Sequence, residues 1–399
     1  MTPVKPTSDS YPVLVSGYYG FDNLGDEAIL QSIIQWFEKR KDVHPVVLSA
    51  NPKATFDAYG VDSIPRANLA RIMKRIFQCP VLIQGGGGLY QDITSSRSLY
   101  YYLGILLLGL ITGRKNVAFG VGIGPLEGEL SPLFTGEFLS QMDLVCVRDL
   151  KSYTFAQSRM PVNAPLKIMA DPALLLEPPD HELIEDIYLK ENLDVLGRPL
   201  IAWSLKGSIK DNRQIISLAR AIDLVNGSLG GGSVIVPFHH PWDFQYAEAV
   251  KGMCSDRDSV FILKERYRPS EILGLIGKCD IVVGMRLHSL IFAANRDVPF
   301  VPVSYDPKID EFSGEFGMKP AAHVPLVGPE RLTEAIEETF ENKNRIKAKI
   351  SQTASRLKTR TSDGFRALDE FFDSLELGRM RIRRSVRKRE GKAEEKKGE

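Results

Sequence analysis

The stretch IVVGMRLHSLIFAAN, residues 281–295, decides how this chain is expected to fold. Residues 281–283 are apolar and β-branched, which indicates a buried strand, whereas residues 291–295 are typical of a helix. Arg286 and His288 stand between them. A strand that passes through a short polar loop into a helix is the unit of a parallel α/β sheet, so both side chains are expected at the carboxyl edge of that sheet.

Short β-type runs of the same kind alternate with helix-length patterns along most of the chain, which is typical of βα units. The pattern at residues 27–39 places Ile29, Ile33 and Phe37 on one helical face. The expected strands lie at residues 13–16, 46–48, 81–83, 117–119, 144–147, 167–169, 200–204, 233–236, 260–262, 280–283 and 300–303. We therefore expect an α/β protein with two Rossmann-like, doubly wound lobes and a cleft between them.

The chain has 399 residues, more than the roughly 250–300 that one hydrophobic core usually supports. Pro178 and Pro179 close the first series of strands. The sequence predicts an N-terminal lobe, a C-terminal lobe, a pair of terminal helices that return to the first lobe or join a partner subunit, and a basic tail expected to be disordered. The predicted boundaries are 1–180, 181–328, 329–377 and 378–399.

Composition narrows the class of protein. Lys and Arg number 51 and Asp and Glu number 50, so no overall field favours nucleic acid. Four widely separated cysteines fit a reducing cytoplasm, and the N-terminal residues do not resemble a signal peptide. The uncharged stretch at residues 98–113 is shorter than the ~20 residues of a membrane span, so a buried helix is the preferred reading. Three tyrosines, residues 100–102, keep an interfacial helix open as the alternative.

Two glycine-containing loops follow expected strands of the first lobe. GYYGFDNLGDEAI, residues 17–29, contains Asn23 and Asp26 at a helix start, where backbone N–H groups can hold a phosphate. Asp26 alternatively only caps that helix. QGGGGLYQD, residues 84–92, contains Gly86 and Gly87, and four glycines in a row permit close approach of a ligand. A tight turn forced by packing is the alternative there.

Cationic and imidazole side chains follow the other strands. Arg148 points into the cleft unless Asp149 or another acid neutralises it. The second lobe adds Lys206, His239, Arg286 and His288, each just beyond a β-type run. Any one of them could be a solvated loop residue, but their shared edge favours binding of a small, multiply anionic substrate. No metal-ligand spacing occurs, and the acidic DPKID, residues 306–310, is expected to cap or turn.

With these motifs in place, the sequence resembles the polysaccharide pyruvyl transferase family, in particular its CsaB-type branch, which acts on a bacterial secondary cell-wall polymer precursor. The resemblance rests on GYYGFDNLGDEAIL from 17, GGGGLYQD from 85, GVGIGPL from 120, VRDLKS from 147, ADPALLL from 170 and GMRLHSLIFAA from 284. It implies a glycosyltransferase-B-like fold, phosphoenolpyruvate as donor and a pyruvate ketal on a sugar as product, without a cofactor or a metal.

The resemblance also implies roles for single residues. Arg286 and His288 are expected to bind phosphoenolpyruvate and catalyse, with His288 protonating its C3 carbon and Arg148 contributing from the first lobe. Lys206 stands where many relatives have arginine, so a bidentate phosphate contact is in doubt there. Asp26 is the candidate base for the sugar hydroxyls, with His239 as another. Gly86, Gly87 and Asn23 complete the expected binding residues.

The acceptor implied by the family is a lipid-diphosphate-linked saccharide, in the CsaB branch one that contains N-acetylmannosamine and serves S-layer anchoring. The tail at residues 379–399 has ten Lys or Arg and four Glu. This excess favours peripheral attachment of a cytoplasmic protein to the anionic inner face of the membrane, whereas a merely solubilising tail is the alternative.

Two rival functions remain open at this stage. A nucleotide-sugar glycosyltransferase of the same architecture would carry a glutamate near the fourth strand of the second lobe, where this chain has arginine and histidine. A non-catalytic glycan-binding or anion-binding protein would bind without releasing phosphate. The sequence does not determine the acceptor sugar, the bridged hydroxyls, the general base or the oligomeric state.

Overall fold

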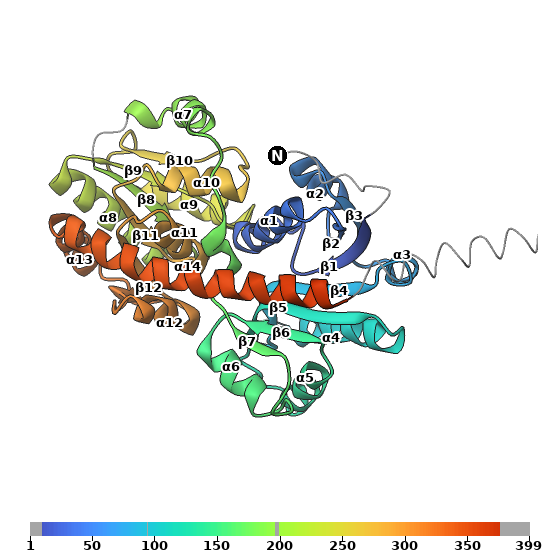
Figure 1. The fold of residues 1–399 in the computed structure, drawn as a ribbon. Helices are drawn as coiled ribbons and strands as arrows, with labels where there is room; N and C mark the ends of the chain where they lie inside the picture. The colour runs from blue at the N-terminus through green and yellow to red at the C-terminus, as the bar shows by residue number, and fades with distance from the viewer. Residues whose placement is uncertain (1–9, 94, 196–198, 376–399) are drawn as a thin grey trace, which may run out of the picture.

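The computed structural model describes residues 10–93, 95–195 and 199–375, which form two α/β lobes side by side (Figure 1). The tail at 378–399 lies outside the described residues. In the first lobe all strand pairs are parallel, in the order β3-β2-β1-β4-β5-β6-β7. These strands are β1 (Tyr11–Ser16), β2 (Val43–Ser49), β3 (Asp62–Pro65), β4 (Val81–Tyr90), β5 (Lys115–Ile123), β6 (Leu144–Val147) and β7 (Leu166–Ile168).

The second lobe repeats this arrangement with a parallel sheet of order β10-β9-β8-β11-β12-β13. Its strands are β8 (Leu200–Ser204), β9 (Gly232–Ile235), β10 (Val260–Ile262), β11 (Ile281–Gly284), β12 (Phe300–Ser304) and β13 (Ala322–His323). In each sheet the chain order reverses next to the first strand, between β1 and β4 and between β8 and β11. Ligands of doubly wound sheets bind at such reversal points.

Helices cover both faces of the first sheet. The helices are α1 (Leu24–Lys39), α2 (Pro52–Tyr59), α3 (Leu69–Ile76), α4 (Ser96–Ile111), α5 (Ser131–Ser140) and α6 (Leu150–Gln157). Buried side chains of α1 pack on one face of the sheet, whereas those of α3, α4 and α5 pack on the other. The two faces therefore have separate cores, which share only the strands between them.

The second lobe is likewise layered on both faces. Its helices are α7 (His181–Lys190), α8 (Asn212–Leu229), α9 (Trp242–Met253), α10 (Pro269–Ile276), α11 (Leu287–Asn295), α12 (Pro307–Glu315) and α13 (Pro329–Glu341), and the short helices η1 (Pro172–Leu175) and η2 (Leu193–Val195) lead into it. Helices α8, α9 and α13 form one core with the sheet, and α7, α10, α11 and η1 form the other.

All eleven strands expected from sequence are present, and two were missed. β3 has four residues, of which only Ile64 is buried, and β13 has two. Both lie at an edge of their sheet, where a strand needs no continuous apolar run because one side lacks a neighbour. The helix expected at residues 27–39 begins earlier, at Leu24, because the side chain of Asn23 accepts a hydrogen bond from the N–H of Gly25 and caps it.

The terminal helix α14 (Lys343–Ser374) returns to the first lobe, one of the two outcomes expected from sequence, and crosses both lobes (Figure 1). Ile350 and Leu357 belong to a core of the second lobe, whereas Leu368 and Phe372 pack with α1 in the first. A single helix of 32 residues thus fastens the two lobes to each other.

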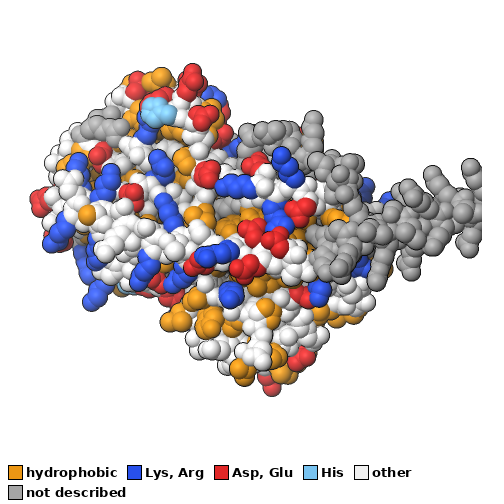
Figure 2. Space-filling model, viewed as in Figure 1, with side chains coloured by type: hydrophobic (Ala, Val, Ile, Leu, Met, Phe, Trp, Pro, Cys, Tyr) orange, Lys and Arg blue, Asp and Glu red, His pale blue; other side chains and the backbone are white. Residues whose placement is uncertain are grey.

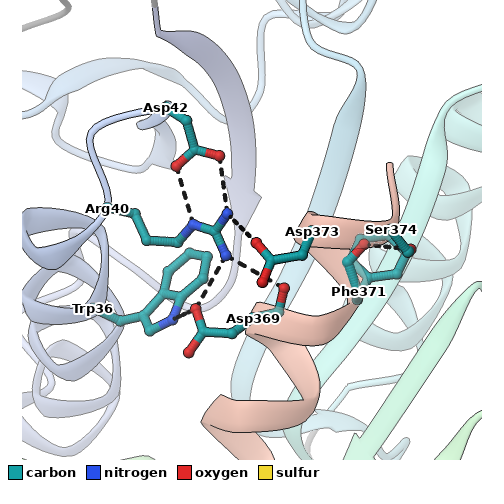
Figure 3. Close-up of polar contacts among 7 residues, drawn as sticks. All are labelled: Trp36, Arg40, Asp42, Asp369, Phe371, Asp373 and Ser374. Carbon is teal, nitrogen blue, oxygen red and sulfur yellow. Dashed lines mark hydrogen bonds and ion pairs between the residues drawn. The ribbon is translucent and has the colours of Figure 1, made fainter. Parts of the chain in front are cut away.

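Arg40, just after α1, anchors the far end of α14 (Figure 3). Its guanidinium donates to Asp42 at 2.9 and 3.0 Å, to the Asp369 carboxylate at 3.1 Å and to Asp373 at 2.8 Å. The indole N–H of Trp36 also donates to Asp369, at 3.0 Å. Because the Arg40 side chain is only 15% exposed, these bonds are partly shielded from water.

Replacing Arg40 with alanine removes these bonds. The free energy of unfolding is expected to fall by about 2 kcal/mol, a typical contribution of hydrogen bonds to charged groups. Urea denaturation measures this, and amide exchange should quicken at residues 365–374. Arg366→Ala on the same helix is the control: its partner, Asp363, is exposed, so the loss should stay below about 0.5 kcal/mol. Equal losses in both variants would contradict an anchoring role for Arg40.

Candidate active site

The carboxyl ends of the two sheets face each other where both chain orders reverse, and polar side chains gather there from both lobes. Two groups meet at this edge. The first comprises Asp26, Arg148, Asp171, His288 and Lys308, and the second comprises Lys206, His239, Asp243, Arg286 and Tyr305.

The first turn of α1 brings Asp26 into the first group. A β-carbon added to Gly25 would lie 2.2 Å from Nδ1 of His288, so only glycine lets the two lobes approach this closely. Gly87 has a φ of +78°, and a β-carbon there would lie 2.6 Å from Oδ1 of Asp26. The glycines at residues 85–88, expected in a loop after the strand, instead lie within β4, which continues to Tyr90. Asp26 therefore faces this glycine run and His288 and leaves the capping of the helix to Asn23.

Asp171 joins the two lobes at the centre of the first group. Its Oδ2 accepts a hydrogen bond from Arg148 at 2.7 Å and lies 3.6 Å from Nε2 of His288, while Oδ1 accepts from the N–H of Ala173 at 3.0 Å. Both side chains of the Arg148 pair are more than 90% buried. Although burial raises the pKa of Asp171, the charges of His288 and Arg148 outweigh it and hold that pKa well below its usual range.

Arg286 is fixed in the same manner within the second lobe. Its guanidinium makes a two-pronged contact with Asp243, through Nε at 3.0 Å and Nη2 at 2.5 Å. Asp243 is 3% exposed and also accepts from the N–H of His239 at 3.0 Å. The bonds to Asp243, aided by Tyr305, raise the pKa of Arg286 against the lowering effect of burial, so its charge is permanent.

Two lysines supply charge that has no acidic partner at ion-pair distance within the described part of the chain. Nζ of Lys206 lies 3.5 Å from the ring centre of Tyr305, and Lys308 stands on the first turn of α12. Burial and the nearby Arg286 lower the pKa of Lys206 to about 8, and burial and Arg148 lower that of Lys308. Both ammonium groups are therefore available to an anion.

The pKa of Asp26 is raised, whereas the pKa values of the two lysines are lowered. Burial raises the pKa of Asp26 to about 6, and the positive charges of His288 and Arg148 only partly offset this. It is thus a carboxylate at neutral pH but a much better proton acceptor than an exposed aspartate. A carboxylate of this kind beside an imidazole and the ammonium group of Lys308 suits proton transfer on an anionic substrate.

The structure brings together Asp26, Arg148, Lys206, His239, Arg286 and His288, all expected from sequence. For four of the expected site residues it also shows a contact that the sequence did not reveal. Arg148 is neutralised by Asp171 rather than by Asp149, which caps α6. Gly86 serves packing, because a β-carbon there would lie 2.0 Å from Ile29. Asn23 and His239 form a backbone bridge between the lobes.

Asp171, Asp243 and Lys308 were not expected in the site. Asp306 caps α12 as expected for DPKID, but the same short motif carries Lys308 into the cleft. Asp171 stands in ADPALLL, directly after an expected strand, and this position was the available signal. Asp243 lies within a helical pattern, where nothing in the sequence sets it apart.

A cavity of about 300 Å³ opens beside the first group, between the lobes. Arg148, Asp171 and Lys308 stand at its polar end, and Leu287 and Phe312 contribute apolar wall. The ion pair of Lys151 with Glu311 joins the two lobes beside it. Across the described residues no group of three His, Cys, Asp or Glu side chains is arranged to hold a metal ion.

The fold and the site together define a two-lobed α/β architecture whose cleft is lined by cationic side chains from both lobes. Comparison with known sequences identifies the family: the profile of the polysaccharide pyruvyl transferase family matches residues 23–307, and the chain belongs to this family. A curated relative, the amylovoran biosynthesis protein AmsJ of Erwinia amylovora, is 20% identical over 256 residues, which are 60% of this chain. The match also spans only about 60% of AmsJ.

Solved structures with the same fold are glycosyltransferase-B-like proteins. The S. aureus MnaA–UDP structure has a TM-score of 0.59 at 10% identity and covers 86% of this chain and 91% of its own. Anabaena HepE in complex with UDP and glucose has a TM-score of 0.59 at 13% identity, covering 91% and 100%. UDP-GlcNAc 2-epimerase from Neisseria meningitidis has a TM-score of 0.60 at 10% identity, covering 91% and 100%. These likenesses establish the fold alone and confirm the one expected.

Asp26→Asn tests the cost of the half-buried charge of Asp26. The folded-state pKa of about 6 exceeds the unfolded value near 3.8, so the carboxylate costs stability above pH 6 and the cost fades as the pH falls towards 4. The variant should therefore be more stable than the wild type by about 1–3 kcal/mol at pH 8, with no gain near pH 4. Denaturant melts across pH measure this, with Asp57→Asn on exposed α2 as control. A variant no more stable at pH 8 would contradict the burial of this charge.

Proposed function

We propose that this protein transfers pyruvate from phosphoenolpyruvate to a sugar as a ketal and releases phosphate. Membership of the polysaccharide pyruvyl transferase family supports the reaction class. The observation that carries the proposal is the position of His288, held near Asp26 and Asp171 and beside cations from strand ends of both lobes. Such a set matches a small substrate that carries two anionic groups and must gain a proton.

The donor would bind through its charges. Phosphoenolpyruvate has a phosphate and a carboxylate, and Lys206, Lys308 and the Asp243-held Arg286 offer cationic donors on one side of the cleft. Arg148 already donates a hydrogen bond to Asp171. Its main role is therefore to orient that carboxylate and to add positive electrostatic potential at the donor site. The cations then stabilise the phosphate as it leaves.

Proton transfer is assigned to His288 and Asp26. His288 gives a proton to C3 of the donor, which becomes a methyl group, while Asp26 takes the proton of the first sugar hydroxyl as that oxygen bonds to C2. The second hydroxyl then bonds to C2, the phosphate leaves and carries off the remaining proton. Asp171 keeps the imidazole oriented across the lobe boundary.

The proposal extends to the acceptor saccharide and to where in the cell the enzyme works. We propose the CsaB-type substrate, a lipid-diphosphate-linked disaccharide with N-acetylmannosamine, made for a secondary cell-wall polymer that anchors an S-layer. An enzyme for that acceptor would work at the inner face of the membrane, attached peripherally. In the part of the chain that the structure describes, no helix is long and apolar enough to cross a bilayer.

Phosphate release from phosphoenolpyruvate, measured with and without this disaccharide acceptor, tests the proposal together with the mass of the product. Acceptor-dependent release and the mass gain of a pyruvate ketal support it. Consumption of a UDP-sugar instead would assign the protein to the rival class of glycosyltransferases, and binding without release would make it a binding protein.

His288→Ala is expected to lower turnover by at least about 10²-fold, because the proposal assigns the protonation of C3 to this imidazole. His181→Ala is the matched control, since that ring is 81% exposed on α7, away from the cleft. Circular dichroism checks that both variants fold. Turnover by His288→Ala equal to that of the control would refute the assignment.

The pH profile should show two limbs. Asp26 must be ionised to accept a proton, so kcat/KM for phosphoenolpyruvate rises through about pH 6. Lys206 loses its charge above about pH 8, so binding weakens on the alkaline side. Lys206→Arg retains a charge at high pH and should remove the alkaline limb, whereas Lys206→Met should raise KM at every pH. An alkaline limb unchanged in the arginine variant would exclude Lys206 as its cause.

A further inference from the structure

Helices α3 and α4 lie next to each other on the outer side of the first lobe (Figure 1). Together they expose several large apolar side chains. Tyr100, Leu107 and Ile111 form one stripe along α4, with exposed fractions of 47%, 44% and 68%. On α3 the exposed apolar residues are Leu69 at 60% and, at its end, Phe77 at 58%. We call these five residues the α3–α4 surface.

Most charges in the stretch that carries this surface are positive. The stretch at residues 63–126, which contains both helices, has seven cations and a single acid, Asp92. The carboxylate of Asp92 is taken up by the backbone N–H groups of Glu127 and Gly128. The seven cations are Arg66, Arg71, Lys74, Arg75, Arg97, Arg114 and Lys115.

Not all of these cations face outward. Arg66 stacks on the ring of Tyr101, and acids neutralise two further cations: Arg75 pairs with Asp62 and Lys115 pairs with Asp143. Arg71, Lys74 and Arg97 are exposed. Exposed apolar residues flanked by exposed cations, with a tyrosine at one end, are typical of a surface that lies in a lipid headgroup layer. A solvated helix would instead carry acids and bases together, as α14 does along the face shown in Figure 2.

Helix α5 offers an internal comparison. It also exposes apolar side chains, Leu133 at 64% and Phe134 at 40%, but exposed acids, Glu129 and Glu137, flank them. An anionic leaflet would repel that region and attract the α3–α4 surface. Both regions expose apolar side chains, so it is the difference in charge that favours the α3–α4 surface over α5 as the membrane contact.

We propose that the α3–α4 surface docks the protein on an anionic membrane, with the apolar stripe inserted among the headgroups. Helix α4 starts shortly after the end of β4, whose glycine run adjoins Asp26, so its first turn lies towards the cleft. Docking by this surface keeps the cleft close to the bilayer. That consequence for a lipid-linked acceptor rests on the proposed function, whereas the docking itself does not.

Vesicle binding of the full-length chain tests the docking. Vesicles of phosphatidylcholine alone are compared with vesicles that contain phosphatidylglycerol. Arg71→Glu with Lys74→Glu should lower the partition coefficient on the anionic vesicles by at least about tenfold. Leu107→Ser with Ile111→Ser should also lower it, because the inserted apolar area is lost. The basic tail is present in every protein, so the comparison isolates the surface.

Matched controls decide what a loss means. Arg345→Glu with Lys347→Glu makes the same change of charge on exposed α14, and Leu133→Ser with Phe134→Ser removes similar apolar area from α5. Both pairs should bind vesicles as the wild type does. Losses as large in the controls, or wild-type binding in the α3–α4 variants, would overturn the proposal. A dimer in solution that only the α3–α4 variants abolish would assign the surface to a second copy of the chain instead.

A direct readout places the surface in the lipid. Tryptophan introduced as Ile111→Trp should be quenched by brominated lipid, and tryptophan introduced as Leu133→Trp should not be. Activity separates this proposal from the catalytic one: α3–α4 variants should lose rate on an acceptor embedded in vesicles but retain it on a short soluble acceptor. If neither the wild type nor any variant showed activity, the proposed function would be wrong, but vesicle binding would still test the docking by itself.

Discussion

The carboxylate of Asp171 is the interaction on which the site depends. It is 6% exposed, bonded to Arg148 of the first lobe and 3.6 Å from His288 of the second. A buried carboxylate needs compensating charge and hydrogen bonds, and here the partners come from two separate sheets. The requirement to neutralise one buried charge therefore constrains how the lobes meet where His288 lies next to Asp26.

Several features outside the site support this meeting of the lobes. The side-chain amide of Asn295 donates to the carbonyls of Ala173, Leu174 and Leu176, which secures the segment that follows Asp171. The N–H of Leu24 donates to the carbonyl of Phe238 at 2.8 Å. Helix α14 then spans both lobes, with Arg40 holding its far end (Figure 3). Positioning at the cleft is thus distributed over contacts far from the reacting groups.

The cationic side chains of the cleft fall into two groups, according to whether a buried acid binds them. Arg148 and Arg286 are each bonded to a buried acid, so they are rigid and permanently charged. Lys206 and Lys308 have no such acid within ion-pair distance among the described residues, and burial lowers the pKa of both. Rigid arginines shape the cleft, and the lysines are the cations with most to gain from an anionic ligand, because binding relieves their desolvated charge.

The sequence by itself determined the sheets and the edge at which function lies. Apolar runs such as residues 281–283 must be buried on both faces, and the loop after such a strand must lie at the carboxyl edge, so Arg286 and His288 could be assigned to the cleft. Only the tertiary structure decided the partners. Asp243 lies within a helix and Lys308 in a capping motif, and neither reveals from its neighbours in sequence that it faces the cleft. Ion pairs depend on which elements pack together, and that packing is set by the whole core rather than by local pattern.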